Sequence, residues 1–274
     1  MIPGSRTGDD PGAIRGLARA RRTAASACLA DMTERLPGTG APAPTAAPAT
    51  TCRSDEVVMI HRLFRRLFAE APGLVRAVSP GDTDRARYLA KHLHGITALL
   101  HVHHRTEDDF FWDRMTERAP ACGLHVELMR RQHGAVSDRL DLVDALVDRW
   151  SRAADAATAA RLAIELDEVD RLLVEHLADE EREAFPVLDR ILSDAEWDDI
   201  HRHARRHKPP LPIFVLLGLM IESVPEGERD QWVATQLPAP IRTAYRVVGR
   251  PQYERAVRRL RPTRATGAGA PATA

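Results

Sequence analysis

The sequence predicts an all-α protein: an up-down-up-down four-helix bundle with a C-terminal helical extension and disordered termini. Between residues 54 and 262, apolar residues recur at three- and four-residue spacing, which is the period of an amphipathic helix. Sustained two-residue alternation, which would indicate a half-buried strand, does not occur in the sequence. Four of the helical segments are long and have short connections, and this favours antiparallel packing of consecutive helices.

The two ends of the chain have the composition of disordered segments. Residues 1–53 are rich in Ala, Pro, Gly, Thr and Arg, and the stretch 36–51 offers too little apolar surface to form a core. We therefore expect four regions. They are a disordered tail (1–53), the bundle (54–192), a helical extension that packs on the bundle (193–262) and a second disordered tail (263–274).

The first predicted helix begins at Ser54, a good N-cap residue, and has Asp55 and Glu56 in its first turn. The sequence Ser-Pro-Gly-Asp at 79–82 is typical of a turn and ends this helix. The remaining long helices are expected at about 83–118, 124–150 and 156–192.

The extension opens with a capping box, Ser193-x-x-Glu196, which predicts the start of another helix. That helix leads into a basic stretch, His201–Lys208, and then into a proline-rich break. Further helices are expected near 213–223, 227–236 and 240–261. A solvated helix face is the ordinary interpretation of the basic stretch, and a site for an anion or an acidic partner is the alternative. The sequence names no protein partner for the extension.

Composition argues against several classes of partner. The 39 basic side chains balance the 39 acidic ones, so there is no electrostatic reason to expect nucleic acid or an acidic membrane surface. The longest apolar run, 211–221, is too short to span a bilayer, and the N-terminus lacks the hydrophobic core of a signal peptide. The three cysteines show no Cys-x-x-Cys spacing, so a zinc ribbon is not indicated. We expect a cytoplasmic protein.

Four histidines occupy positions in the apolar stripes where a helix bundle would ordinarily have leucine. They are His61, His103, His133 and His176, one in each predicted bundle helix. Two of them carry a glutamate four residues later, Glu107 and Glu180, and residues four apart share a helix face. Because burying so many polar groups is costly unless something inside satisfies them, the pattern indicates a metal site.

The depth of these groups in the bundle agrees with one shared site. His61 and His133 lie about seven and about nine residues into their helices, and both glutamates lie about a dozen residues from their helix ends. In an antiparallel bundle these offsets place all six groups at one level. A neighbouring pair with the same spacing, His104 and Asp108, lies in a polar stripe and is expected at the rim or in solvent. Asp109 and Glu181 are expected to be surface charges.

Four imidazoles and two carboxylates suit a pair of iron ions, with manganese as the alternative. Each ion would take two histidines and the glutamates would bridge, as in two-metal sites with ions roughly 3.5–4 Å apart. A lone zinc ion would use only three or four of these groups. The ferritin-type centre uses Glu-x-x-His, and this spacing does not occur in the chain.

The order His, His-x-x-x-Glu, His, His-x-x-x-Glu resembles the hemerythrin-like family, also called the hemerythrin HHE cation-binding domain. The local strings HHRTEDDFFW (103–112) and EHLADEEREAFP (175–186), the latter with Phe185-Pro186, are similar to those of the family. The resemblance covers about 55–192. It implies that His61, His103, His133 and His176 are metal ligands and that Glu107 and Glu180 are bridging ligands.

One departure from the family bears on function. Members that carry oxygen have a further histidine one turn after the third-helix ligand, where this chain has Ser137. The resemblance, with this departure, implies a non-haem di-iron protein that binds, senses or reacts with small oxidants: O2, peroxide or nitric oxide. The alternatives are a passive iron-binding or iron-buffering protein without turnover, or a metal-free interaction module. Whether the protein is an enzyme stays open at this point.

Overall fold

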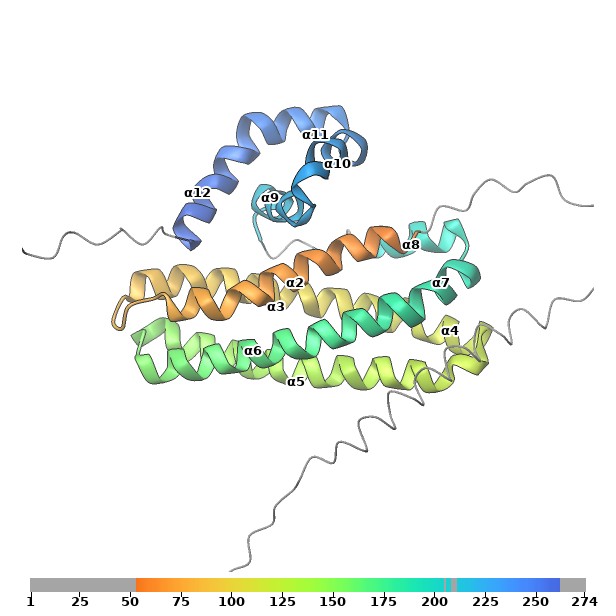
Figure 1. Cartoon of the computed structure of the whole chain (residues 1–274), viewed down its shortest axis with the longest axis horizontal. Helices are drawn as coiled ribbons and strands as arrows, with labels where there is room; N and C mark the ends of the chain where they lie inside the picture. Colours follow the sequence, from red (N-terminus) through yellow and green to blue (C-terminus); the bar gives the residue numbers. More distant parts are fainter. Residues whose placement is uncertain (1–52, 205, 208–210, 262–274) are drawn as a thin grey trace, which may run out of the picture.

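The computed structural model describes residues 53–204, 206–207 and 211–261, and within these ranges it is all-helical, without a strand (Figure 1). The prediction of an all-α protein is confirmed for this part of the chain. The two predicted tails lie outside the described residues, apart from Arg53. None of the described helices combines the length and hydropathy that crossing a membrane requires.

Four long helices form a helical bundle, as Figure 1 shows. They are α2 (Asp55–Arg76), α3 (Thr83–Phe110), α5 (Gly123–Ala153) and α6 (Ala156–Asp179). Helix α2 packs against α3 and α6, and α5 packs against the same two helices, so the four surround one core. The buried face of each helix carries the apolar stripe that its sequence predicts.

Two of the predicted long helices are interrupted. The second ends at Phe110, and a separate helix α4 (Trp112–Arg118) and a short turn η1 (Pro120–Cys122) follow it. The fourth passes through a π-helical turn, η2 (Glu180–Ala184), before it continues as α7 (Phe185–Ile191). Helix α8 (Asp194–Ala204) then packs on α3.

The π-helical turn has a local cause in the sequence. Pro186 has no amide hydrogen and so cannot donate the α-helical bond to the carbonyl four residues earlier. The preceding amide, that of Phe185, donates to the carbonyl of Glu180, a bond to the fifth residue back. Such π-bulges are frequent at functional sites. Here the turn contains Glu180, one of the two glutamates predicted to bind metal.

The two helix starts predicted at Ser54 and Ser193 differ in their side-chain hydrogen bonds. The capping box is confirmed, because the Ser193 amide donates to Glu196 Oε2 at 2.9 Å and the Glu196 amide donates to Ser193 Oγ at 3.3 Å. Ser54 is the N-cap residue of α2 and Asp55 and Glu56 lie in the first turn, as predicted, but the Ser54 side chain makes no capping bond. Its hydroxyl instead donates to Asp189 Oδ2 at 2.7 Å and ties the start of α2 to α7. Ser54 has helical backbone angles (φ −60°, ψ −22°), whereas an N-cap residue ordinarily has an extended conformation.

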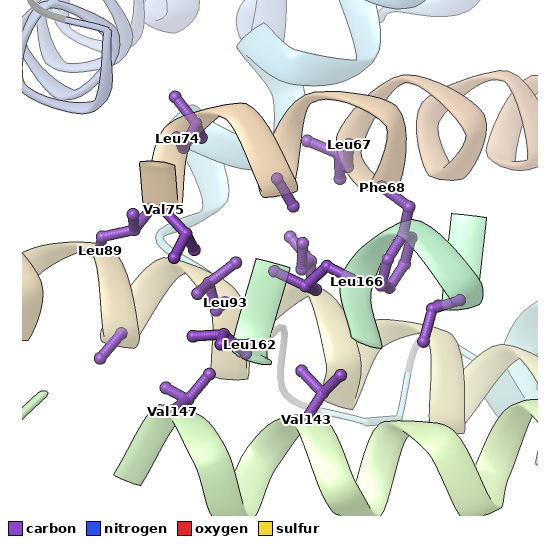
Figure 2. Close-up of a cluster of buried hydrophobic side chains, with 14 of the residues drawn as sticks. Leu67, Phe68, Leu74, Val75, Leu89, Leu93, Val143, Val147, Leu162 and Leu166 are labelled. Carbon is purple, nitrogen blue, oxygen red and sulfur yellow. The ribbon is translucent and has the colours of Figure 1, made fainter. Parts of the chain in front are cut away.

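Two apolar clusters fill the bundle. The larger one lies toward the α2–α3 turn and contains leucines, valines and Phe68 from all four long helices (Figure 2). The smaller one lies at the other end, between α4, α5, α7 and α8, and includes Phe111, Trp112, Phe185 and Trp197. The buried histidines and glutamates belong to neither cluster.

The rest of the described chain, residues 211–261, lies against α2 and α3 (Figure 1). Its helices are α9 (Ile213–Ser223), η3 (Glu226–Glu228), α10 (Arg229–Gln236), α11 (Ala239–Ala244), the π-helical η4 (Tyr245–Gly249) and α12 (Arg250–Leu260). Helix α9 packs on α2 and α12, and four buried residues join the larger apolar cluster: Leu211, Val215, Leu219 and Leu260.

Close packing and an ion-pair network hold this extension in place. A Cβ atom at Gly218 would lie 2.3 Å from the Tyr253 ring, so only glycine allows α9 and α12 to approach this closely. Arg261 donates to Glu70 of α2 at 2.6 Å and to Glu222 of α9 at 2.8 Å.

Candidate metal centre

Seven buried or nearly buried residues from all four long helices and η2 bring their ligand atoms together. One group consists of His61, His103, Glu107 and Glu180, and the other of His104, Glu107, His133 and His176. Within each group the ligand atoms lie within 4.8 Å of one another. Glu107 belongs to both groups, so the two groups form one continuous site.

All six residues predicted from the sequence are part of this site, and the structure adds a seventh, His104. The prediction that His104 faces the rim or solvent is wrong, because its side chain is 5% exposed and its ring stacks on His133 with centroids 4.2 Å apart. The polar stripe that argued against it is itself buried in part, since Ala90 and Thr97 also pack inward. The buried face of a bundle helix is wide enough to hold two consecutive residues, here His103 and His104.

The two oxygens of Glu107 face different histidines. Oε1 lies 3.1 Å from His103 Nε2 and 4.0 Å from His61 Nε2, whereas Oε2 lies 3.6 Å from His133 Nε2. Glu180 also stands between the groups, with Oε2 3.5 Å from His61 Nε2 and 3.7 Å from His176 Nε2. Both carboxylates therefore lie between histidines of the two groups.

These ligand atoms are buried without the hydrogen bonds that buried polar atoms ordinarily make. The Nε2 atoms of all five histidines and both oxygens of Glu107 and Glu180 lack a hydrogen-bond partner of regular geometry. Since an unsatisfied buried polar atom costs about 1–3 kcal/mol, so many in one place need an interior partner. Bound cations would supply such partners, because these nitrogen and oxygen atoms are metal-ligand atoms.

The electrostatics of the site favour a cation as well. Burial, together with the other imidazoles, holds the pKa of His103, His104 and His176 well below the usual value, and burial lowers that of His61. These rings are neutral at pH 7 and offer lone pairs. Burial raises the pKa of Glu180 to about 8 and that of Glu107 well above 4.5, because without a cation nothing offsets their charges. A bound dication reverses this preference and keeps both glutamates ionised.

A second layer of side chains contacts three of the histidines through Nδ1. Glu181 accepts from His61 at 2.8 Å, Asp108 accepts from His133 at 2.8 Å, and Gln132 Oε1 lies 3.3 Å from His176 Nδ1. The prediction that Asp108 and Glu181 are surface charges is therefore incomplete. Both side chains are partly exposed to solvent, but one carboxylate oxygen of each accepts a hydrogen bond from a buried imidazole. Asp109 is exposed, as predicted.

Other histidines of the described residues lie outside the two donor groups. His92 is buried near Glu70 and Arg261, and burial lowers its pKa to about 4. His94 is half-exposed and bonds Asp144 and Asp148 at 2.9 and 3.0 Å. In the basic stretch, Arg205 and Lys208 lie outside the described residues, and His201 lies 3.4 Å from Glu56.

The donor set fits a pair of transition-metal ions. Neutral imidazoles and carboxylates are ligands that iron and manganese accept, and the two groups each offer four donors around a shared glutamate. Aromatic rings pack against the set. The ring centroid of Phe185 lies 5.3 Å from that of His61 in a stacked pair, and the Phe64–His103 and Trp112–His133 pairs are tilted, with centroids 5.0 and 5.7 Å apart.

Comparison with protein-family models gives one match, the hemerythrin HHE cation binding domain, over residues 53–188. Comparisons with curated proteins and with solved structures give no match. The matched segment contains all seven residues of the site, and this family's domain implies a bound metal, typically iron. Through residues 53–188, the chain belongs to the hemerythrin HHE cation-binding domain family.

Proposed function

We propose that this protein is a non-haem di-iron protein that binds and reacts with a small oxidant: O2, peroxide or nitric oxide. The observation that carries the proposal is the division of seven buried donors into two groups that share Glu107. A single ion would leave several of these donors unsatisfied, whereas two ions use all of them. We take iron as the metal, with manganese as the alternative, because imidazole and carboxylate suit both.

The proposal includes the arrangement of the long helices as an up-down-up-down four-helix bundle. In such a bundle, metal ligands project inward from facing helices at one level. Helix α2 contributes His61, α3 contributes His103, His104 and Glu107, α5 contributes His133, and α6 with η2 contributes His176 and Glu180. Rigid helices hold these donors without help from loops.

The two metal positions would be unequal. One has three imidazoles and the other has two, while Glu107 and Glu180 stand between them. If both glutamates are shared by the two ions, the two-imidazole position has one protein donor fewer than the other, and we expect a small ligand to enter there. Bound iron supplies one-electron chemistry toward O2, peroxide or nitric oxide. The protein's own residues orient the donors, and the two apolar clusters keep bulk water from them.

His104 changes one argument made from the sequence. Ser137 stands where members that carry oxygen have a further histidine, so the six residues predicted from the sequence are one imidazole short of an oxygen carrier's set. In the structure, His104 supplies a fifth imidazole from α3 instead of α5. The imidazole count therefore no longer disfavours reversible O2 binding, and all three oxidants stay in the proposal.

Metal analysis and reactivity together test the proposal. We expect purified protein to carry about two irons per chain. We also expect the reduced protein to consume peroxide or nitric oxide, with a change in its optical spectrum. Glu180→Ala removes a carboxylate between the two groups and should abolish this reaction, whereas Glu175→Ala, on the exposed side of the same helix, should not.

Each alternative has its own outcome in the same experiment. Two irons without any reaction toward the three oxidants would favour a passive iron-binding protein. Folded protein that takes up neither iron nor manganese would contradict the proposal and favour an interaction module built on the bundle.

A further inference from the structure

Three imidazoles of the candidate centre are each contacted at Nδ1 by a side chain of another helical segment. Glu181 of η2 holds His61 of α2, Asp108 of α3 holds His133 of α5, and Gln132 of α5 holds His176 of α6. We call Glu181, Asp108 and Gln132 the outer partners. Each contact therefore joins two helical segments as well as two side chains.

The outer partners all use Nδ1 and leave Nε2 facing inward. Carboxylates only accept, so His61 and His133 donate Nδ1–H to Glu181 and Asp108, both at 2.8 Å. In a neutral imidazole the other nitrogen then has the free lone pair. Nε2 of both rings is the atom that lies near Glu107 or Glu180. The contacts thus select the tautomer that a metal requires.

The two carboxylate partners differ in the group that contacts them in turn. Glu181 Oε1, the oxygen bound to His61, also accepts from the Arg65 guanidinium at 2.7 Å. Asp108 Oδ1, the oxygen bound to His133, also accepts from the Trp112 indole at 2.9 Å. Arginine carries a positive charge that offsets the charge of Glu181, whereas the indole N–H orients Asp108 without neutralising it.

Gln132 completes the series with a neutral amide. Its oxygen faces His176 Nδ1, and its nitrogen donates to Asp179 Oδ2 at 3.0 Å, which fixes the amide orientation. Asp179 is in turn held by Arg182. The Nδ1 atoms of these three histidines therefore face three different groups. His133 faces a carboxylate without an arginine partner, His61 faces a carboxylate paired with Arg65, and His176 faces a neutral amide.

We propose that Glu181, Asp108 and Gln132 are positioning residues of the metal centre, and that their graded charge makes His133 the strongest imidazole donor. The proposal rests on the proposed metal-binding function. A carboxylate behind an imidazole raises its basicity as a ligand, and such outer partners typically contribute 10–100-fold to metal affinity. Asp108 should contribute more than Glu181, because Arg65 offsets the charge of Glu181 alone.

Cobalt(II) titration of the metal-free full-length protein tests the proposal. We expect Asp108→Ala to weaken cobalt binding about 10–100-fold and to shift the visible cobalt bands. Asp108→Asn keeps an acceptor oxygen but loses the charge, so its loss should be smaller. Asp109→Asn, on the neighbouring exposed position, is the matched control and should bind like the unaltered protein.

The order of the charges is tested by the reduction potential of the iron-loaded protein. Loss of a negative charge behind a ligand should raise this potential, and more for Asp108→Asn than for Glu181→Gln. Arg65→Met should lower it, because it leaves Glu181 uncompensated. A purely structural role would move the unfolding temperature of these variants without this ordered change in potential.

The outcomes separate this inference from the proposed function. If Asp108→Asn and Asp108→Ala, both folded by circular dichroism, keep unaltered cobalt affinity and potential, the inference is wrong while the metal site stands. Equal potential shifts in Asp108→Asn and Glu181→Gln would contradict the grading. If the unaltered protein binds no cobalt or iron, the proposed function and the inference both fail.

Discussion

The two halves of the bundle interior are built from the same helices but differ in what their side chains need. Toward the α2–α3 turn, α3 buries Leu89, Leu93, Ile96 and Leu100 in an apolar cluster. Within the next two turns, the same helix carries His103, His104 and Glu107. The apolar half is satisfied by packing alone, whereas the polar half has buried atoms without partners.

Stability and metal binding therefore depend on different parts of one continuous core. Burial of leucine and valine drives folding whether or not a cation is present. The polar half contributes least to stability when it is metal-free, because its imidazoles and carboxylates lose hydration and gain little in return. Substitutions in the two halves should therefore have separable effects.

The largest effect is expected for Glu107→Ala in the polar half. Glu107 is the residue common to both donor groups, so its loss should reduce metal content from about two ions per chain to one or none. The fold should persist, because the substitution also removes a buried unsatisfied carboxylate. Elemental analysis measures the metal content, and circular dichroism on the same sample measures the helical fold. Retention of two ions would show that Glu107 does not link the groups.

Leu166→Ala in the apolar half is the matched counterpart. Leu166 is fully buried in the larger cluster, and truncation of such a residue costs about 2–5 kcal/mol of unfolding free energy. Metal content of the folded protein should not change. Chemical denaturation with and without metal checks this prediction, and a loss of metal without a loss of stability would break the division between the halves.

The metal-free protein should respond to pH through Glu180. Its folded pKa is raised to about 8 from 4.5, so its contribution to stability is complete below about pH 4.5 and is lost as pH rises to 8. The expected loss is a few kcal/mol, since each pKa unit corresponds to about 1.4 kcal/mol. Metal should abolish it.

The histidines act in the opposite direction in the same experiment. The lowered pKa values of His61, His103, His104 and His176 mean that their contribution is complete above pH 6.5 and declines at lower pH. The difference in unfolding free energy between the unaltered protein and Glu180→Gln, measured from pH 4.5 to 8, isolates the glutamate. A flat difference would contradict the prediction.

The smallest effect is expected for His104→Ala. It removes one of three imidazoles from one position, and we expect about 10–100-fold weaker binding of one ion while the other stays bound. His94→Ala, on the same helix but half-exposed, is the control. Isothermal titration with cobalt distinguishes the two binding steps. Equal behaviour of the two variants would place His104 outside the metal site.

Much of this arrangement could be predicted from local patterns in the sequence. His103 and Glu107 were identifiable because they continue an apolar stripe with a period that only a helix provides. The same stripe logic misplaced His104, because it treats the buried face of a helix as one residue wide. The burial of His104 beside His103 depends on where α5 packs against α3, and the sequence of α3 alone does not contain that information.

The outer partners could not be predicted from the sequence for a related reason. Glu181 and Asp108 look like ordinary surface charges in the sequence, and each becomes part of the site only through a histidine that is 120 or 25 residues away. The π-helical turn was not predicted either, because the helix was expected to continue to residue 192. In the structure this turn contains Glu180 and Glu181, and both lie beside His61.

The sequence by itself therefore determined the all-helical fold, the six candidate donors whose spacing places them on apolar stripes, and the family. These follow from helical period and residue chemistry, which are local. The tertiary structure decided that a fifth imidazole, His104, joins the donors and that the site divides into two groups around Glu107. It also decided which charge stands behind each histidine, because relative helix rotation depends on packing along the whole interface.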